Sequence, residues 1–287
     1  MQKTGLIDGQ AIADKILARV KDQVDFLHTK NVQPKLAVIL VGDHAPSIRY
    51  VTRKEKAAAE VGIGFELVRL PSDADQTMII KTISDLQTDP NLSGLIVQLP
   101  LPEPLYTSEV LNAIEAARDI DCLTDVNMGK LIMNTGWITP PTAAAVFAII
   151  KDQPINVVGK NVVVIGLGAL VGKPLSVMLM NARASVTTIN SATPDVQAKC
   201  LAADIIVSGV GKAGLVRGDM VKPGALVIDA GVSFVDGVMH GDAIVDEIVD
   251  HALVTPTPGG VGPLTIAKLL ENTVRCAARQ HSLTLPE

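Results

Sequence analysis

Residues 161–174 have the sequence NVVVIGLGALVGKP, in which a run of β-branched residues passes through a glycine-rich turn into a helix-forming segment. The apolar run at 161–165 is typical of a buried strand in a parallel sheet. Glycines in such a turn let the backbone approach a pyrophosphate, and free N–H groups at the start of the next helix can bind it. The GxGxxxG spacing is one residue longer than the common fingerprint, so it also fits a plain turn whose glycines serve packing. The flanking strand and helix favour dinucleotide binding.

Strand and helix patterns alternate on both sides of this turn. Short apolar runs predict strands over residues 36–41, 65–70, 94–98, 161–165, 185–189, 204–207 and 225–228. Three- and four-residue spacing of apolar residues predicts helices over 12–27, 47–61, 75–86 and 264–279, and a further helix from the glycine turn to residue 181. This alternation indicates an α/β protein with parallel sheets and right-handed crossovers. Residues 119–142 show no such pattern and are interpreted as a linker.

The composition narrows the class of protein. A chain of 287 residues suggests two domains, and with 48% hydrophobic but only 2% aromatic residues its core is built from Ala, Val, Ile and Leu. A net charge of −5 without a basic run argues against nucleic-acid binding. The three cysteines and five histidines are scattered, so we expect reduced core thiols and no metal site. No signal-peptide core and no membrane span of about 18 apolar residues is found, so a cytoplasmic protein without membrane contact is expected.

Polar residues in the first half point to a second candidate site. Tyr50 and Lys54 are four residues apart on a predicted helix, so they share one face, and Ser47 lies one turn earlier. Gln98 ends a predicted buried strand just before a proline-rich loop, and polar groups at the carboxyl ends of parallel strands commonly face ligands. Together they would border a cleft. By themselves, Tyr50 and Lys54 also fit an ordinary half-exposed pair.

These segments resemble the bifunctional methylenetetrahydrofolate dehydrogenase/methenyltetrahydrofolate cyclohydrolase family. The matching blocks are VGxxxxSxxYVxxKxK at 41–56, GxxVQLPLP at 94–102, the DVD motif at 119–121, VGxP at 171–174 and PGGVGPMT at 258–265. Asn127 and Gly129 fit an NxGRL segment in which Lys130 replaces the arginine. The blocks occur in the same order over nearly the whole chain, which makes a chance match negligible.

The resemblance implies a role for each matching residue of the first domain. Lys54 would be the catalytic amine of the cyclohydrolase step, and Gln98 would hold Lys54 and help to position water. Tyr50 would stack on the aromatic rings of the folate, and Asp121 would bind the amino-pyrimidine edge of the pterin. These four are the expected catalytic residues. A neutral Lys54 could take the proton of water if burial lowered its pKa from about 10.4.

The resemblance also implies the cofactor site. The expected cofactor contacts are Gly166, Leu167, Gly168, Val171, Gly172, Lys173, Pro174, Ser191 and Gly259. The turn at Pro258, Gly259 and Gly260 would close over nicotinamide and folate. Where this family usually has Gly-Arg-Ser, with an arginine on the 2′-phosphate of NADP, this chain has Gly166-Leu167-Gly168. No acid follows the second strand to repel that phosphate, so NADP is expected and NAD stays an alternative.

Three further departures lie outside these sites. Residues 141–145 replace a CTPxG segment at the domain junction, Cys122 replaces the glycine usual after Asp121, and Pro46 replaces an alanine. They affect the expected hinge and not the four catalytic residues.

The whole pattern predicts two α/β domains flanking a cleft. Residues 1–143 with 264–287 would form the folate-binding catalytic domain, and 144–263 the Rossmann-type NAD(P)-binding domain. The expected reactions oxidise methylenetetrahydrofolate with NADP and hydrolyse the product to 10-formyltetrahydrofolate in a homodimer. The alternatives are a monofunctional NAD-dependent dehydrogenase of the same family, a related dehydrogenase of another small substrate, and a folate- or nucleotide-binding relative without catalysis.

Overall fold

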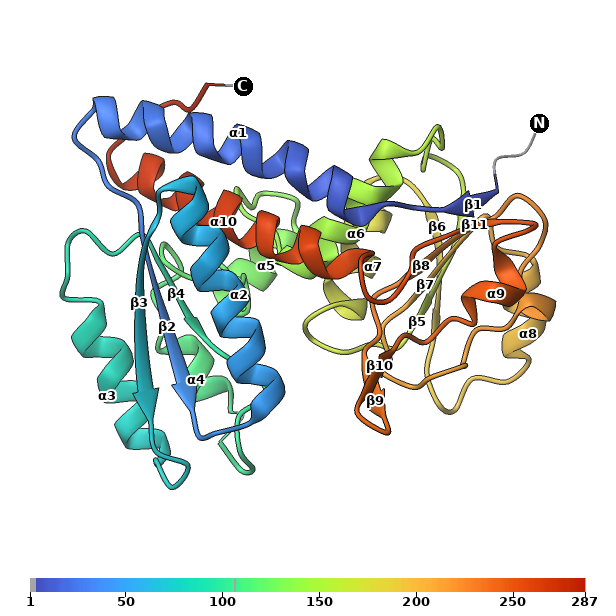
Figure 1. Ribbon diagram of the computed structural model, residues 1–287, viewed down its shortest axis with the longest axis horizontal. Coiled ribbons are helices and arrows are strands. Elements are labelled where there is room, and N and C mark those ends of the chain that lie inside the picture. Colours follow the sequence, from blue (N-terminus) through green and yellow to red (C-terminus); the bar gives the residue numbers. More distant parts are fainter. Residues whose placement is uncertain (1–3, 106, 287) are drawn as a thin grey trace. The chain divides into compact units, whose positions relative to one another are not determined.

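The computed structural model describes residues 4–105 and 107–286, which fall into two compact units (Figure 1). We call them by their sheets. The six-stranded unit comprises Met1–Ala13, Leu131–Thr135 and Thr142–Thr265. The three-stranded unit comprises Asp14–Lys130, Gly136–Pro141 and Ile266–Glu287.

The three-stranded unit is a small parallel sheet with strand order β3-β2-β4, covered by helices. Its elements are β2 (Lys35–Val41), α2 (Ala45–Val61), β3 (Gly64–Leu70), α3 (Gln76–Leu86), β4 (Gly94–Val97) and α4 (Ser108–Asn112). It also holds most of α1 (Gly9–Thr29), α5 (Asp125–Ile132) and α10 (Val261–Gln280). Every residue of β4 is buried, as expected for a strand covered on both faces.

The six-stranded unit is a parallel sheet with strand order β1-β11-β8-β7-β5-β6. Its strands are β1 (Gly5–Leu6), β5 (Asn161–Ile165), β6 (Ser185–Ile189), β7 (Ile205–Ser208), β8 (Leu226–Asp229) and β11 (Leu253–Val254). Its helices are α6 (Pro141–Asp152), α7 (Gly172–Asn181), α8 (Val196–Leu201), α9 (Val245–Ile248) and the 3-10 helix η1 (Gly218–Met220). A separate antiparallel hairpin joins β9 (Ser233–Val235) to β10 (Val238–His240). Because β5 lies between β6 and β7, the direction of winding reverses at β5, where such sheets bind ligands.

The predicted fold class, α/β with parallel sheets, is confirmed, and two local expectations are wrong. Residues 119–142, expected to be a linker, contain α5 and the start of α6. Helix α5 escaped notice because the residue that it buries most deeply is polar Asn127, so the segment lacks an apolar period. Residues 4–13, assigned to the folate domain, belong to the six-stranded unit, in which Gly5–Leu6 pairs in parallel with Leu253–Val254.

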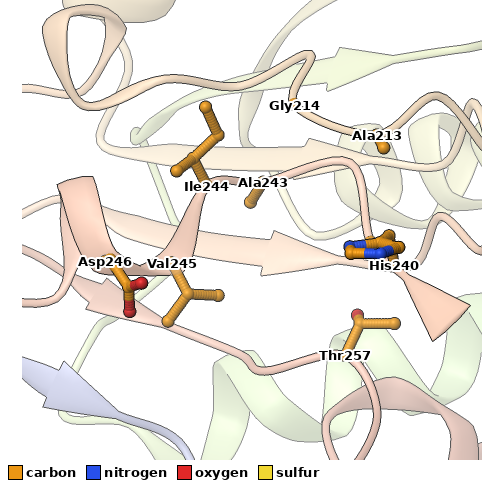
Figure 2. Close-up of a pocket in the computed structure, with 9 residues that line it drawn as sticks. Ala213, Gly214, His240, Ala243, Ile244, Val245, Asp246 and Thr257 are labelled. Carbon is orange, nitrogen blue, oxygen red and sulfur yellow. The ribbon is translucent and has the colours of Figure 1, made fainter. Parts of the chain in front are cut away.

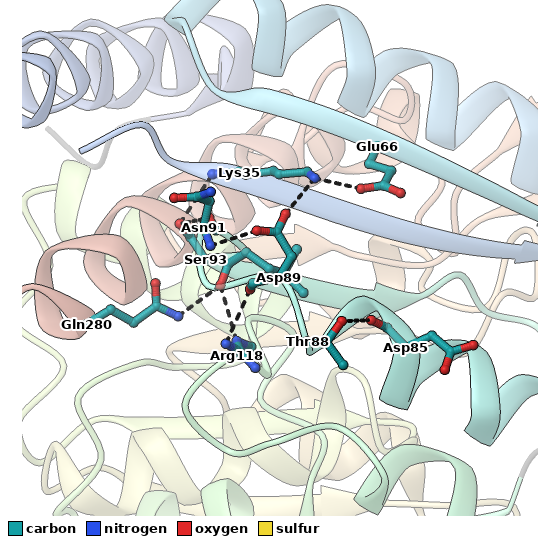
Figure 3. A network of polar contacts seen from close by, with 10 residues as sticks. Lys35, Glu66, Asp85, Thr88, Asp89, Asn91, Ser93, Arg118 and Gln280 are labelled. Carbon is teal, nitrogen blue, oxygen red and sulfur yellow. Dashed lines mark hydrogen bonds and ion pairs between the residues drawn. The ribbon is translucent and has the colours of Figure 1, made fainter. Parts of the chain in front are cut away.

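A polar network fastens the amino-terminal edge of the three-stranded sheet (Figure 3). The Lys35 amine lies 2.8 Å from both Glu66 and Asp89, which raises the pKa of Lys35 and lowers that of Asp89. Arg118 donates to the carbonyl of Leu92, and Gln280 at the end of α10 donates to the same oxygen at 2.9 Å. Neighbouring strands, a loop and the last helix are thus joined at the edge opposite the strands' carboxyl ends.

The glycine turn after β5 is packed too closely for side chains at two of its positions. Gly166 has a φ of +89°, which favours glycine. A Cβ on Gly172 would lie 1.8 Å from the carbonyl oxygen of Gly166, so the first turn of α7 rests on the strand end. A Cβ on Gly168 would meet nothing within 4 Å.

This contrast predicts the effect of two alanine substitutions. Gly172→Ala forces a backbone oxygen to move and should lower the free energy of unfolding by about 2–4 kcal/mol, the scale of severe overpacking. Gly168→Ala is the matched control and should change stability by less than about 0.5 kcal/mol, because its side chain projects into open space. Urea unfolding of both variants measures the difference. Equal stability would contradict the close packing of α7 on Gly166.

Candidate active site

Helix α2 carries the buried lysine of the three-stranded unit. The residues that it buries are Ser47, Val51, Lys54, Ala58 and Val61, which recur at the spacing of one helix face. The helix ends at Gly62, whose φ of +81° lets its N–H bond the last carbonyls. Lys54 therefore points inward from a face that is otherwise small or apolar, and Tyr50, one turn earlier, is partly buried.

A single amide oxygen receives the Lys54 amine. Lys54 Nζ donates to Gln98 Oε1 at 3.0 Å, and each residue is only 9% exposed. The backbone N–H of Gln98 donates to the Ile39 carbonyl at 2.8 Å, which extends the sheet ladder one residue past β4. Gln98 Nε2 donates to the carbonyl of Leu99 at 2.6 Å. Because this bond fixes which end of the amide is the donor, Oε1 is left facing the amine.

Burial sets the charges of this site. It lowers the pKa of Lys54 from 10.5, while the negative charge of Asp121 opposes that shift. Burial likewise raises the pKa of Asp121 to about 6, a rise that Lys54 opposes and Asp119 reinforces. Within the described part of the chain, no hydrogen-bond donor reaches the Asp121 carboxylate, so its oxygens are available to a ligand. The site therefore pairs an amine that loses its proton readily with an acceptor for N–H groups.

Three loops of the six-stranded unit meet at the carboxyl edge of its sheet. Gly166 N donates to the Ile189 carbonyl at 2.9 Å, and Gly209 N donates to the Ile165 carbonyl at 3.0 Å. Residues 166–171, 190–193 and 209–212 therefore begin side by side. The amino end of α7 lies in this group, and Ser191 is exposed. A helix amino end beside loops that contain no acidic residue fits a nucleotide phosphate.

Two buried aspartates outside the predicted site fix the backbone nearby, Asp242 in the 209–212 loop and Asp229 at Gly231 and Ala243. Asp242 is fully buried and accepts from Ser208 Oγ at 2.6 Å, Val210 N at 2.8 Å and Lys212 N at 2.7 Å. Asp229 accepts backbone N–H groups at 2.9 Å, and burial raises its pKa to about 6. Asp229 could have been found from the sequence, because it ends an apolar run that predicts a strand. Asp242 lies in a segment without periodicity and gave none.

A pocket of about 450 Å³ adjoins the segment predicted to close over the ligands (Figure 2). Its lining includes Ala213, Gly214, Ile244 and Val245, with His240 beside Thr257 and Asp246 at the other end. Thr257 directly precedes the predicted turn, in which Pro258 is exposed, Gly259 has a φ of +102° and Gly260 is buried. The pocket belongs entirely to the six-stranded unit.

The predicted site residues thus form two groups, one in each unit. Those of the three-stranded unit are Tyr50, Lys54, Gln98 and Asp121. Those of the six-stranded unit are Pro258, Gly259, Gly260, Gly166, Leu167, Gly168, Val171, Gly172, Lys173, Pro174 and Ser191. Lys54 and Gln98 are in direct contact, and Asp121 is close enough for its charge to act on Lys54.

Comparison with known proteins identifies both units. Residues 7–121 match the family model described as tetrahydrofolate dehydrogenase/cyclohydrolase, catalytic domain. Residues 140–281 match the model described as tetrahydrofolate dehydrogenase/cyclohydrolase, NAD(P)-binding domain. The bifunctional protein FolD of Methanosphaerula palustris is 40% identical over 283 residues, which cover 98% of this chain and 99% of that protein.

Solved structures agree along the whole chain. The bifunctional FolD enzyme of Campylobacter jejuni has a TM-score of 0.92 at 37% identity, covering 96% of this chain and 98% of its own. The Trypanosoma brucei methylenetetrahydrofolate dehydrogenase-cyclohydrolase, solved with NADP and an inhibitor, has a TM-score of 0.93 at 36% identity, covering 97% and 99%. Among residues 4–105 and 107–286, none of the helices combines the length and the apolar character needed to cross a membrane.

The raised pKa of Asp121 predicts how stability depends on pH. Since its folded pKa of about 6 exceeds the ordinary 3.8, the folded state holds the proton more tightly, and this contribution is lost as pH rises from about 4 through 6. The Asp121→Asn variant has no carboxylate to ionise and should not lose this contribution. Its free energy of unfolding relative to that of the parent should therefore be higher at pH 8 than at pH 4, by on the order of 1–3 kcal/mol. Urea unfolding at both pH values measures the gain.

The control is Asp73→Asn, which removes an exposed carboxylate from the same unit. A difference between the Asp121→Asn variant and the parent that is the same at pH 4 and pH 8 would show that ionising Asp121 costs the folded state nothing.

Proposed function

The chain belongs to the tetrahydrofolate dehydrogenase/cyclohydrolase family, and from this premise we propose which of its residues perform each reaction. It is a bifunctional enzyme of one-carbon metabolism, a methylenetetrahydrofolate dehydrogenase and methenyltetrahydrofolate cyclohydrolase. The first reaction removes a hydride from the methylene carbon, and the second adds water to the resulting methenyl cation. The observation that carries our proposal is the buried Lys54 amine held against Gln98 Oε1 at 3.0 Å.

Lys54 is the general base of the hydrolysis in this proposal. Burial favours its neutral form, whose lone pair can accept a proton from water while the water oxygen bonds to the methenyl carbon. The bond from that carbon to N5 then breaks as the hydroxyl of the adduct loses its proton to solvent and becomes the formyl carbonyl. N5 receives the proton held by Lys54, which leaves the formyl group on N10. Gln98 Oε1 accepts an N–H of the amine and so directs the lone pair.

Asp121 and Tyr50 bind the folate. A reduced pterin presents several N–H donors along one edge, and a carboxylate that meets no donor in the described protein can accept two of them. With a pKa of about 6, Asp121 is mostly ionised at neutral pH, as this role requires. Tyr50 lies one helical turn from Lys54, where its ring can stack on a flat ligand whose reactive carbon is near the amine.

The six-stranded unit is the NAD(P)-binding domain, and we propose that its cofactor is NADP. The residues present fit the group, because the turn admits no side chain at Gly172 and the amino end of α7 offers N–H groups to a phosphate. When bound, the nicotinamide accepts the hydride, which needs positioning and exclusion of water but neither acid nor base. Ser191 and the absence of an acid beside it leave room for a 2′-phosphate. A homodimeric state and a cytoplasmic location complete the proposal.

The role of Lys54 predicts a selective loss. Lys54→Met keeps most of the apolar stem but removes the base, so cyclohydrolase turnover should fall by about 10² or more. Methenyltetrahydrofolate, followed by its absorbance, should accumulate when methylenetetrahydrofolate and NADP are supplied. Lys56→Met is the matched control, because Lys56 is 80% exposed two residues away and should not affect the rate. Parental hydrolysis by Lys54→Met would disprove the assigned base.

The turn predicts a weakened preference for NADP. Leu167 stands where an arginine would reach the 2′-phosphate, and one charge-assisted bond contributes about 1.5–3 kcal/mol, so Leu167→Arg should raise the NADP-to-NAD ratio of kcat/KM at least several-fold. The value with NAD should hardly change. Leu170→Arg, a 42% exposed position of the same turn, is the control for a general charge effect. An unaltered ratio in Leu167→Arg would show that residue 167 does not face the 2′ position.

A further inference from the structure

The loop that carries Asp121 is fixed from both sides of that residue. The N–H of Cys122 donates to the Asp119 carbonyl at 3.1 Å, which ties down the peptide after Asp121. The peptide before Asp121 presents the carbonyl of Ile120, and this oxygen accepts from Asn272 Nδ2 at 2.8 Å. Because the two peptide planes flanking a residue set the direction of its Cα–Cβ bond, these two hydrogen bonds help to fix the direction in which the Asp121 side chain leaves the backbone.

Asp119 closes the rest of the loop. It is 1% exposed, and its carboxylate accepts from Leu123 N at 3.1 Å, Thr124 N at 2.9 Å, Thr124 Oγ1 at 2.7 Å and Asn127 Nδ2 at 2.9 Å. Both carboxylate oxygens of Asp119 thus have donors from the protein itself. The loop closed by these bonds includes Cys122 at a φ of +57°, a left-handed conformation that side chains seldom adopt. The loop shape is therefore imposed by its surroundings.

Among the residues that hold the Asp121 loop, Asn272 comes from a distant segment of the chain. It lies on α10, is 3% exposed, and its Nδ2 also donates to the carbonyl of Thr139 at 2.8 Å. One side-chain amide thus joins two loops to the last helix. A buried amide costs stability unless its hydrogen bonds are made, and here both N–H groups of Asn272 are used.

We propose that Asn272 is a positioning residue for folate, acting through the Ile120 carbonyl to aim Asp121. The inference rests on the proposed function, in which Asp121 grips the pterin edge. It goes beyond that function by making part of the folate affinity depend on a residue 151 positions away in the sequence, on a helix whose residue numbers fall in the cofactor-domain match. The competing explanation is that Asn272 only secures α10, as Gln280 does through the Leu92 carbonyl at the far end of the same helix.

The experiment is a double-mutant cycle on the full-length enzyme. The variants are Asn272→Ala, Asp121→Ala and the double substitution, with Gln280→Ala as the matched control. The measurements are KM for methylenetetrahydrofolate, KM for NADP and the thermal unfolding midpoint. Asn272→Ala should raise the folate KM about tenfold, the scale of a misplaced binding group, and leave the NADP KM unchanged. In the Asp121→Ala background, the same substitution should add almost nothing to the folate KM.

The controls separate aiming from folding. Gln280→Ala should lower the unfolding midpoint without raising the folate KM, because its bond lies at the amino-terminal edge of the sheet. Asn272→Ser, which keeps one donor, should fall between parent and alanine. If Asn272→Ala does not fold, Thr124→Val provides the test. It removes one donor from Asp119 at nearly constant volume and should raise the folate KM in the same direction.

Two results would overturn the inference. Either Asn272→Ala and Asn272→Ser lower the midpoint but leave the folate KM at the parental value, or the KM effects of Asn272→Ala and Asp121→Ala multiply in full. A parental folate KM in Asp121→Ala alone would instead refute the proposed role of Asp121, and the inference with it. The failure of each idea is therefore recognised in a different variant.

Discussion

The hydrogen bond between the buried Lys54 amine and the Gln98 amide oxygen is the interaction on which the arrangement of the three-stranded unit depends. Removing the amine from water disfavours its charge, which is the property that Lys54 needs for the base role that we propose. The same burial would destabilise the unit if the amine met no acceptor, so the fold must hold Gln98 Oε1 within hydrogen-bond distance of the amine. It does so because its backbone continues the ladder of β4 onto β2, from whose end the chain enters α2.

The opposite edge of that sheet carries the bonds that make such placement rigid. Ion pairs and side-chain bonds to backbone carbonyls at Lys35, Arg118 and Gln280 gather at the amino-terminal ends of the strands (Figure 3). No residue of this network belongs to the site, which lies past the carboxyl end of β4. Stability and chemistry are therefore assigned to opposite edges, and the ligand edge can keep groups that are not saturated by the protein.

The elements were predictable where one physical signal dominates. The strand was predicted over residues 161–165 and the next helix was predicted to end at residue 181, and the structure has both bounds. An uninterrupted β-branched run followed by glycine is compatible with few other structures. Helix α5 was missed since it buries Asn127, and β1 because two residues carry no period. The expected catalytic residues came from motifs, whereas Asp242 and Asn272 act through backbone atoms that no residue pattern specifies. A polar residue at a core position of a predicted helix was the available clue to Asn272.

Asp119, Asp121 and Asp242 differ in the hydrogen-bond donors that they meet within the chain, and in our proposal this difference separates a ligand-binding carboxylate from a structural one. Asp119 and Asp242 accept four and three hydrogen bonds from their own chain, so each is already solvated by the protein. Asp121 lies two residues from Asp119, and burial raises its pKa, yet within residues 4–105 and 107–286 it receives no donor. A carboxylate that meets few donors in its own chain keeps acceptor capacity for a ligand. The difference in hydrogen bonding between these neighbouring carboxylates thus supports the ligand-binding role that we propose for Asp121, which their shared motif does not single out.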